Sequence, residues 1–182
     1  MFEGSPAPKR EQDGTRVTVA DFFTALRVPL AVAFVLEPSP AWRLSVLLIS
    51  GGSDLLDGWL ARRYGSSRLG VFIDPVADKL FMAAAFGVVL WSRQLAIYEV
   101  IAVLLRDIVA TVAFVGTAFS GRVRTIPARL GGKAVTLAQM LTLLAFVVQS
   151  PLLRPLAWAT AAIALYAIWD YTRAAPREKR AL

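Results

Sequence analysis

The sequence contains no cysteine and no histidine among its 182 residues. Without them the chain has no thiol nucleophile, no disulfide, no cysteine or histidine ligand for zinc and no serine–histidine relay. Charged residues are also scarce, at 18%, whereas 57% of the residues are hydrophobic. A soluble domain usually has about 25% charged and about 45–50% apolar residues. The composition therefore predicts an integral membrane protein whose chemistry uses carboxylates, hydroxyls, lysine and arginine.

The twenty basic residues outnumber the thirteen acidic ones and are unevenly distributed. Fifteen of them fall into four clusters, at 9–27, 62–68, 122–133 and 173–180, whereas Arg43, Arg93 and Arg154 stand alone between clusters. Basic clusters mark cytoplasmic loops, and in a membrane protein they favour anionic headgroups over nucleic acid as partners. The alternation predicts both termini in the cytoplasm and six spans, at 25–40, 42–63, 70–92, 95–119, 133–152 and 155–172.

These spans define the expected fold class, an all-α integral membrane protein built as a six-transmembrane-helix bundle. Residues 1–16 lack an apolar run, which predicts a polar, disordered N-terminal lead and no signal peptide. Residues 17–27 predict a short interfacial helix with Phe22 and Phe23 turned toward lipid. The six-helix domain is expected to cover 17–172, and 173–182 to form a basic cytoplasmic tail.

Four aspartates lie where the second and third spans meet. Asp54 and Asp57 are three residues apart and Asp74 and Asp78 are four apart, so each pair shares one face of its helix. Two antiparallel neighbouring helices would bring the four carboxylates together in the cytoplasmic half of the bundle. Because four like charges need compensation there, the pattern predicts bound magnesium or manganese, and two ions would suit phosphoryl transfer. The alternative is that the acids reach toward water and pair with nearby arginines.

The same segment carries eight fixed positions of a known signature: Asp54, Asp57, Gly58, Ala61, Arg62, Gly70, Asp74 and Asp78. The pattern resembles that of the CDP-alcohol phosphatidyltransferases. Near the N-terminus the family tends to show Pro-Asn followed by Thr-x-x-Arg. Here Thr24 and Arg27 are kept, but Ala20-Asp21 replaces Pro-Asn.

The resemblance implies a metal-dependent enzyme of phospholipid biosynthesis that transfers the phosphatidyl group of CDP-diacylglycerol to an alcohol and releases CMP. It implies two divalent cations, Mg²⁺ or Mn²⁺, on the four aspartates, with Asp78 also serving as general base. The residues implied to contact CDP are Gly58, Ala61, Arg62, Gly70 and Thr24. A homodimer in a bacterial inner membrane, with its active site facing the cytoplasm, is also implied.

Two further segments are candidates for binding the acceptor. Arg106-Asp107 lies within the fourth span, and Gly132-Lys133-x-x-Thr136-x-x-Gln139 opens the fifth with a polar stripe. The candidate acceptor-binding residues are Arg106, Lys133, Arg124 and Arg129. Two alternatives remain: Arg106 and Asp107 neutralise each other, and the loop residues contact lipid headgroups.

The sequence indicates the general reaction more clearly than it indicates the acceptor. The run from Asp74 to Lys79 looks like phosphatidylglycerophosphate synthases, which use glycerol 3-phosphate, whereas Arg106-Asp107 looks more like cardiolipin synthases, which use phosphatidylglycerol. We favour glycerol 3-phosphate, with phosphatidylglycerol and inositol phosphate as alternatives. A divalent-cation transporter is the rival from another class, but it would need acids along a whole route through the membrane.

Overall fold

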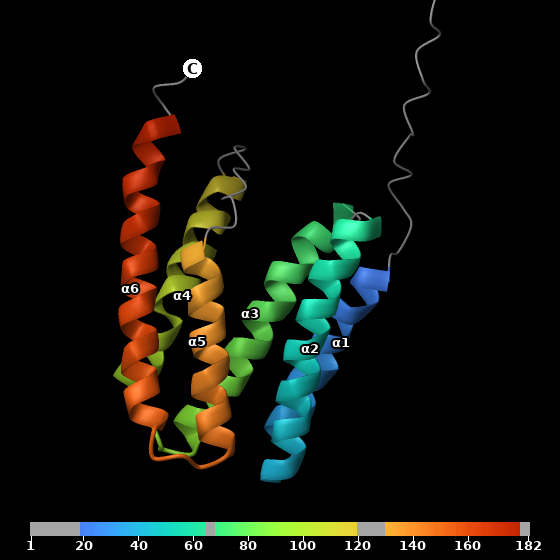
Figure 1. The fold of residues 1–182 in the computed structure, drawn as a ribbon, viewed down its shortest axis with the longest axis vertical. Helices are drawn as coiled ribbons and strands as arrows, with labels where there is room; N and C mark the ends of the chain where they lie inside the picture. The colour runs from blue at the N-terminus through green and yellow to red at the C-terminus, as the bar shows by residue number, and fades with distance from the viewer. Residues whose placement is uncertain (1–18, 65–67, 120–129, 179–182) are drawn as a thin grey trace, which may run out of the picture.

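The computed structural model describes residues 19–64, 68–119 and 130–178, which form six α-helices (Figure 1). The helices are α1 (Val19–Leu36), α2 (Pro40–Tyr64), α3 (Arg68–Trp91), α4 (Ile97–Phe119), α5 (Leu130–Val147) and α6 (Leu153–Glu178). The prediction of an all-α protein with six helices is confirmed. The predicted disordered lead and the end of the basic tail lie outside the described residues, and α6 continues past the predicted boundary at residue 172.

The interfacial helix predicted for 17–27 is not a separate element in the structure. Residues 19–27 belong to α1, which continues without interruption to Leu36 and includes Pro29. The segment from Val19 to Arg27 contains neither glycine nor proline, so nothing in it ends a helix before the next apolar stretch begins. One helix therefore replaces the predicted interfacial helix and first span.

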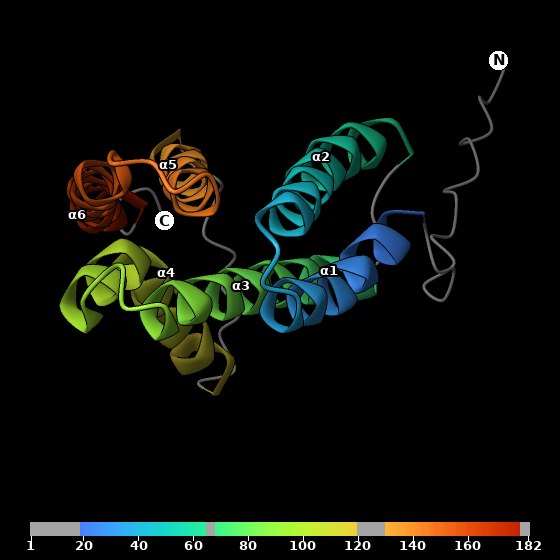
Figure 2. The same ribbon diagram turned by 90° about the horizontal axis from the view of Figure 1, so that it is seen from below.

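The helices form two groups of three that are joined through their inner members (Figures 1 and 2). In one group α1 packs against both α2 and α3, and in the other α6 packs against both α4 and α5. Contacts of α2 with α5 and of α3 with α4 and α5 connect the groups. Buried apolar side chains fill this junction, including Phe81 and Phe86 of α3, Leu143 of α5 and Phe34 of α1, whose ring meets that of Phe81 edge-on at 6.1 Å.

The structure differs from the expectation that α2 and α3 pack directly against each other. Among the described residues these helices share no broad contact surface; each packs instead against α1. They remain connected through the three residues between Tyr64 and Arg68, so their motif-bearing ends lie at the same end of the bundle (Figure 1). The N-terminal ends of α1 and α5 lie at that end as well.

The fifth helix is shorter than the predicted span of 133–152. It ends at Val147, after which Gln149 has a positive φ of 53°. The amide of Ser150 donates to the carbonyl of Ala145 at 2.8 Å and that of Gln149 to Phe146 at 3.1 Å. This pair of bonds is a Schellman ending, which satisfies carbonyls that the last helical turn leaves open.

Apolar side chains cover much of the described outer surface. Exposed examples occur on every helix, among them Val32, Leu48, Leu80, Val112, Leu141 and Leu165. Within the described ranges, none of the helices combines the length and uninterrupted apolar character required of a membrane span.

Candidate active site

The aspartate motif, defined as Asp54, Asp57, Asp74 and Asp78, is divided between two helices. Asp54 and Asp57 lie on α2, and Asp74 and Asp78 lie on α3. The predicted CDP contacts Gly58, Ala61 and Arg62 follow on α2, Gly70 lies in the first turn of α3, and Thr24 lies on α1. Of the four aspartates, Asp78 is the one whose side chain is described. The described residues contain no group of three metal-binding side chains, so the predicted four-carboxylate site stays a prediction.

Asp78 faces a basic residue from the neighbouring helix. Its Oδ1 lies 3.9 Å from Nη1 of Arg27 on α1, and the Arg27 side chain is 5% exposed while that of Asp78 is 37% exposed. A buried guanidinium is stable when an acid compensates its charge. The close packing of α1 on α3 brings this arginine, which the sequence placed in the N-terminal basic cluster and in the Thr-x-x-Arg pair, to Asp78. The carboxylate remains partly exposed beside it.

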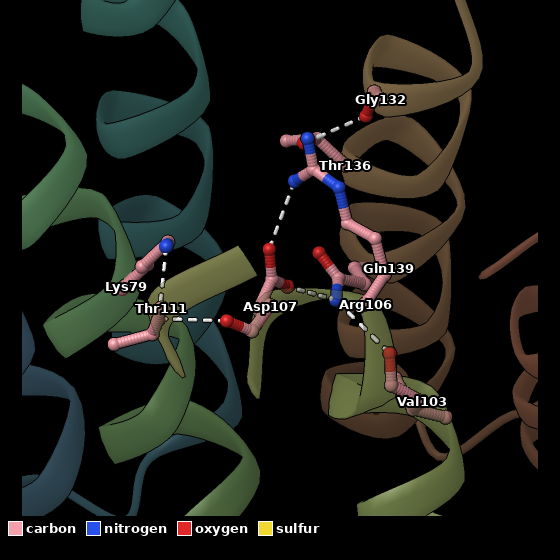
Figure 3. Close-up of polar contacts among 8 residues, drawn as sticks. All are labelled: Lys79, Val103, Arg106, Asp107, Thr111, Gly132, Thr136 and Gln139. Carbon is pink, nitrogen blue, oxygen red and sulfur yellow. Dashed lines mark hydrogen bonds and ion pairs between the residues drawn. The ribbon is translucent and has the colours of Figure 1, made fainter. Parts of the chain in front are cut away.

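Lys79, the next residue on α3, links that helix to α4 (Figure 3). Its Nζ donates a hydrogen bond to Oγ1 of Thr111 at 2.8 Å, and that hydroxyl donates to the backbone carbonyl of Asp107 at 2.6 Å. Lys79 therefore continues the polar region from Asp78 toward the arginine and aspartate on α4. Sequence spacing could not show this hydrogen bond, because Thr111 lies 32 residues from Lys79.

Arg106 and Asp107 on α4 form a direct ion pair. Nη1 of Arg106 donates to Oδ1 of Asp107 at 2.9 Å. This agrees with the alternative, stated from the sequence, that the two residues neutralise each other. The other carboxylate oxygen, Oδ2, accepts a 2.7 Å hydrogen bond from Nε2 of Gln139 on α5. The same nitrogen donates to the carbonyl of Val103 at 3.1 Å, and Gln139 is buried. Asp107 is thus held from two sides, by the arginine beside it and by the neighbouring helix.

The guanidinium of Arg106 lies against the backbone of α5. A Cβ atom added at Gly132 would come within 2.6 Å of Nη2 of Arg106 and 3.1 Å of the Tyr171 hydroxyl of α6. Gly132 therefore leaves the space that these two groups use. Nε of Arg106 is buried and has no hydrogen-bond partner among the described residues.

The remaining acceptor candidates are less closely connected to Arg106. Lys133 follows Gly132 in the first turn of α5 and is exposed. Thr136 in the polar stripe donates to the carbonyl of Gly132 at 3.3 Å within its own helix. Arg124 and Arg129 lie outside the described residues. Gly132, the residue before Lys133, lies against the Arg106 guanidinium (Figure 3), and α5 begins toward the end of the bundle that carries the aspartate motif (Figure 1).

Comparison with known proteins identifies relatives along most of the chain. Residues 17–169 match the family described as CDP-alcohol phosphatidyltransferase. A CDP-diacylglycerol--glycerol-3-phosphate 3-phosphatidyltransferase of Haemophilus influenzae is 34% identical over an alignment of 131 residues, which covers 67% of this chain and 71% of that protein. The protein of the same description from Escherichia coli K12 is 31% identical over 135 residues, covering 69% of this chain and 72% of its own.

A relative described as a different enzyme has the same percentage identity over a shorter alignment. A cardiolipin synthase (CMP-forming) of Streptomyces coelicolor is 34% identical over an alignment of 116 residues that covers 55% of this chain. The alignment covers 54% of that protein, so the chain spans about half the length of this relative. Sequence identities of 31% to 34% do not decide which of these two activities the chain has.

Proposed function

Because the chain belongs to the CDP-alcohol phosphatidyltransferase family, we propose that it transfers the phosphatidyl group of CDP-diacylglycerol to glycerol 3-phosphate and releases CMP. The family and the class of enzyme predicted from the aspartate motif are confirmed by the match over residues 17–169. The choice of acceptor rests on one observation: Arg106, a guanidinium suited to a phosphate group, is fixed near the N-terminal end of α5.

The aspartates have the donor chemistry that the reaction needs. Membership of the family implies a membrane enzyme that uses a divalent metal, and carboxylate oxygens are the ligands that Mg²⁺ and Mn²⁺ prefer. We assign two such ions to Asp54, Asp57, Asp74 and Asp78. Bound there, the ions would neutralise the negative charge of the pyrophosphate. We assign the role of general base to Asp78, whose carboxylate is partly exposed.

The proposed reaction is a single displacement at phosphorus. The Asp78 carboxylate takes the proton of the acceptor hydroxyl, and the acceptor oxygen forms a new bond to the phosphorus that carries diacylglycerol. The bond from this phosphorus to the bridging oxygen breaks, and CMP leaves with the electron pair. Arg27, which pairs with Asp78, helps to hold the carboxylate in place.

The nucleotide is assigned to the ends of α2 and α3. Gly58 and Ala61 are small residues that leave space for the cytidine, and Arg62 supplies a positive charge for its phosphates. Gly70 and Thr24 complete the proposed CDP contacts from α3 and α1. For the acceptor we assign Arg106 and Lys133, together with Arg124 and Arg129 from the segment outside the described residues.

Phosphatidylglycerol is the second candidate acceptor, and one observation favours it. The Arg106 guanidinium is already paired with Asp107, so its capacity to neutralise a further anion is reduced. A phosphodiester with a single negative charge needs less compensation than a phosphate monoester. The similarity to the Streptomyces coelicolor cardiolipin synthase is in agreement with this alternative.

We further propose that the chain lies in the bacterial inner membrane as a homodimer, with both termini cytoplasmic. Exposed aromatic side chains support the membrane assignment: Trp42, Trp91, Tyr98 and Trp158 lie near the end of the bundle opposite the aspartate motif. Amphipathic aromatic rings are typical of a membrane–water interface. Single cysteines at 66 and 93 test the topology, because the natural chain has none. An impermeant reagent applied outside should modify position 93 and spare position 66.

The activity is tested with the full chain in lipid nanodiscs and CDP-diacylglycerol radiolabelled in its lipid. Glycerol 3-phosphate, phosphatidylglycerol and inositol phosphate are supplied separately, and products are resolved by chromatography together with released CMP. Fastest transfer to glycerol 3-phosphate supports the proposal, and fastest transfer to another alcohol replaces the acceptor. Absence of transfer with all three, combined with uptake of manganese into vesicles that contain the protein, would favour the transporter instead.

A further inference from the structure

The position of the Arg106 side chain depends on three residues that touch it or its partner. Asp107 pairs with Nη1, Gln139 holds the far oxygen of Asp107, and Gly132 leaves room for Nη2. We call Asp107, Gly132 and Gln139 the arginine seat. Two of its members lie on α5, whereas Arg106 lies on α4, so the seat depends on how these helices pack.

Among the described residues, the hydrogen bonds of Gln139 go to Val103 and Asp107 and not to Arg106. They nevertheless restrict where Asp107 can lie. Its Nε2 reaches Oδ2 of Asp107 and the carbonyl of Val103 at the same time. Val103 lies one helical turn before Asp107 on α4, so one amide group spans the turn that leads to the aspartate. A buried polar group with two partners has little freedom to change rotamer.

Gly132 acts by the side chain that it lacks. A methyl group there would come within 2.6 Å of Nη2, closer than atoms can approach, and the atom that would have to move is the end of a long side chain. The arginine would therefore shift, while the helix backbones need not. This makes Gly132 a position at which substitution can move Arg106 without unfolding the protein.

The arginine seat does not use the full hydrogen-bonding capacity of Arg106. Nε is buried without a hydrogen-bond partner among the described residues, and Asp107 is engaged on Nη1. The Arg106 side chain also hydrogen-bonds to that of Tyr171 on α6, so the guanidinium nitrogen without a partner in the described part of the chain is Nε. A phosphate oxygen is an acceptor that would complete the hydrogen bonding of Nε.

We propose that Asp107, Gly132 and Gln139 are positioning residues that hold the guanidinium of Arg106 in place for the phosphate of the acceptor. The inference rests on the proposed acceptor role of Arg106. It adds that specificity for a phosphorylated acceptor depends on side chains that do not touch the substrate. Holding the fork in place before binding reduces the ordering cost that an unrestrained arginine would impose on each encounter.

The test compares steady-state kinetics of Gly132→Ala and Gln139→Leu with those of Gly87→Ala, using the full chain in nanodiscs. Gly87 lies on α3, and an added Cβ there meets nothing within 4 Å, which makes it a matched control. The two seat variants should raise the KM for the acceptor by about tenfold or more, as loss of a hydrogen bond to a charged group does. Their KM for CDP-diacylglycerol should stay within about twofold, and Gly87→Ala should match the natural protein in both.

A double-mutant cycle separates positioning from a general structural effect. If Gly132 acts through the arginine, Gly132→Ala should change the acceptor KM little in an Arg106→Gln background. An equal effect in both backgrounds would overturn the proposal. If Gly132→Ala cannot be purified folded, the same cycle with Gln139→Leu decides.

The kinetics of Arg106→Gln distinguish failure of the positioning role from failure of the proposed acceptor role. If Arg106→Gln raises the acceptor KM while neither seat variant does, the positioning role is wrong and the acceptor role of Arg106 stands. If Arg106→Gln leaves the acceptor KM unchanged, the acceptor role is wrong and the seat has no function in binding.

Discussion

The aspartate motif and the arginine seat solve opposite electrostatic problems. The motif places four acids on α2 and α3, where they need added positive charge. Around Arg106, by contrast, the chain supplies its own compensation through Asp107, held by Gln139. The four acids need a bound cation to balance their charge, whereas Arg106 lacks a partner only at Nε among the described residues. This contrast suggests that the motif carries the chemistry and the seat carries the choice of acceptor.

The strongest test of this contrast is removal of the proposed base. Asp78→Asn keeps the size of the side chain but removes its charge, so turnover should fall by roughly 10²–10⁴-fold, as when a general base is lost. CDP-diacylglycerol affinity, measured by calorimetry with a CDP-alcohol, should fall far less. Near-normal turnover of this variant would assign proton transfer to another group.

Metal removal and a ligand change extend that test to the rest of the motif. Chelation should abolish turnover, and added magnesium should restore it. Asp57→Asn or Asp74→Asn should lose most activity even at raised magnesium, because either removes a charged ligand. Expression and membrane insertion, checked by fluorescence-detected chromatography, should be retained. Full turnover in excess chelator contradicts the metal assignment.

Arg106 is expected to have the next largest effect, and of a different kind. Arg106→Gln should raise the acceptor KM by roughly 10–100-fold, the range for a lost hydrogen bond between charged groups, with a smaller change in turnover at saturation. Lys133→Gln should raise the same KM by only a few-fold, because the exposed lysine is not held in one position. Equal effects of the two variants would remove the distinction between a positioned and a mobile cation.

Breaking the hydrogen-bonded link between the aspartate motif and the arginine seat should reduce turnover less. Thr111→Val removes the hydroxyl that joins Lys79 to the backbone of Asp107. Turnover should fall by about two- to fivefold, consistent with roughly 1 kcal/mol for one partly exposed hydrogen bond. Thr172→Val is the matched control, because its hydroxyl bonds within its own helix to the carbonyl of Trp169. If both variants lose equally, Lys79 does not couple the regions.

The smallest effect is expected at a glycine outside the seat. A Cβ at Gly51 would lie 3.3 Å from Cε of Met140, the flexible end of a methionine that can move aside. Gly51→Ala should therefore change the unfolding temperature and the acceptor KM little. Measured beside Gly132→Ala, it shows whether the seat is sensitive because of Arg106 or because any glycine in the bundle is.

The sequence alone was sufficient to predict the six helices and to identify the family. Apolar stretches separated by basic clusters predicted six helices at approximately the observed positions, because helical hydrogen bonds are local and apolar length is visible in one dimension. The error at α1 has a local cause too. An amphipathic segment followed directly by an apolar one reads as two elements, although no residue between them ends the helix.

The eight fixed positions from Asp54 to Asp78 were readable because their spacing along two helices carries the pattern. What the sequence could not supply was the partner of each polar residue. Arg27 and Asp78 are 51 residues apart, and Gln139 and Asp107 are 32 apart; such pairs form only when helices pack. Spacing within a helix is fixed by its pitch, whereas contacts between helices depend on which faces pack together. The sequence by itself therefore determined the family and its candidate reactive carboxylates, and the tertiary structure decided which residues hold Arg106.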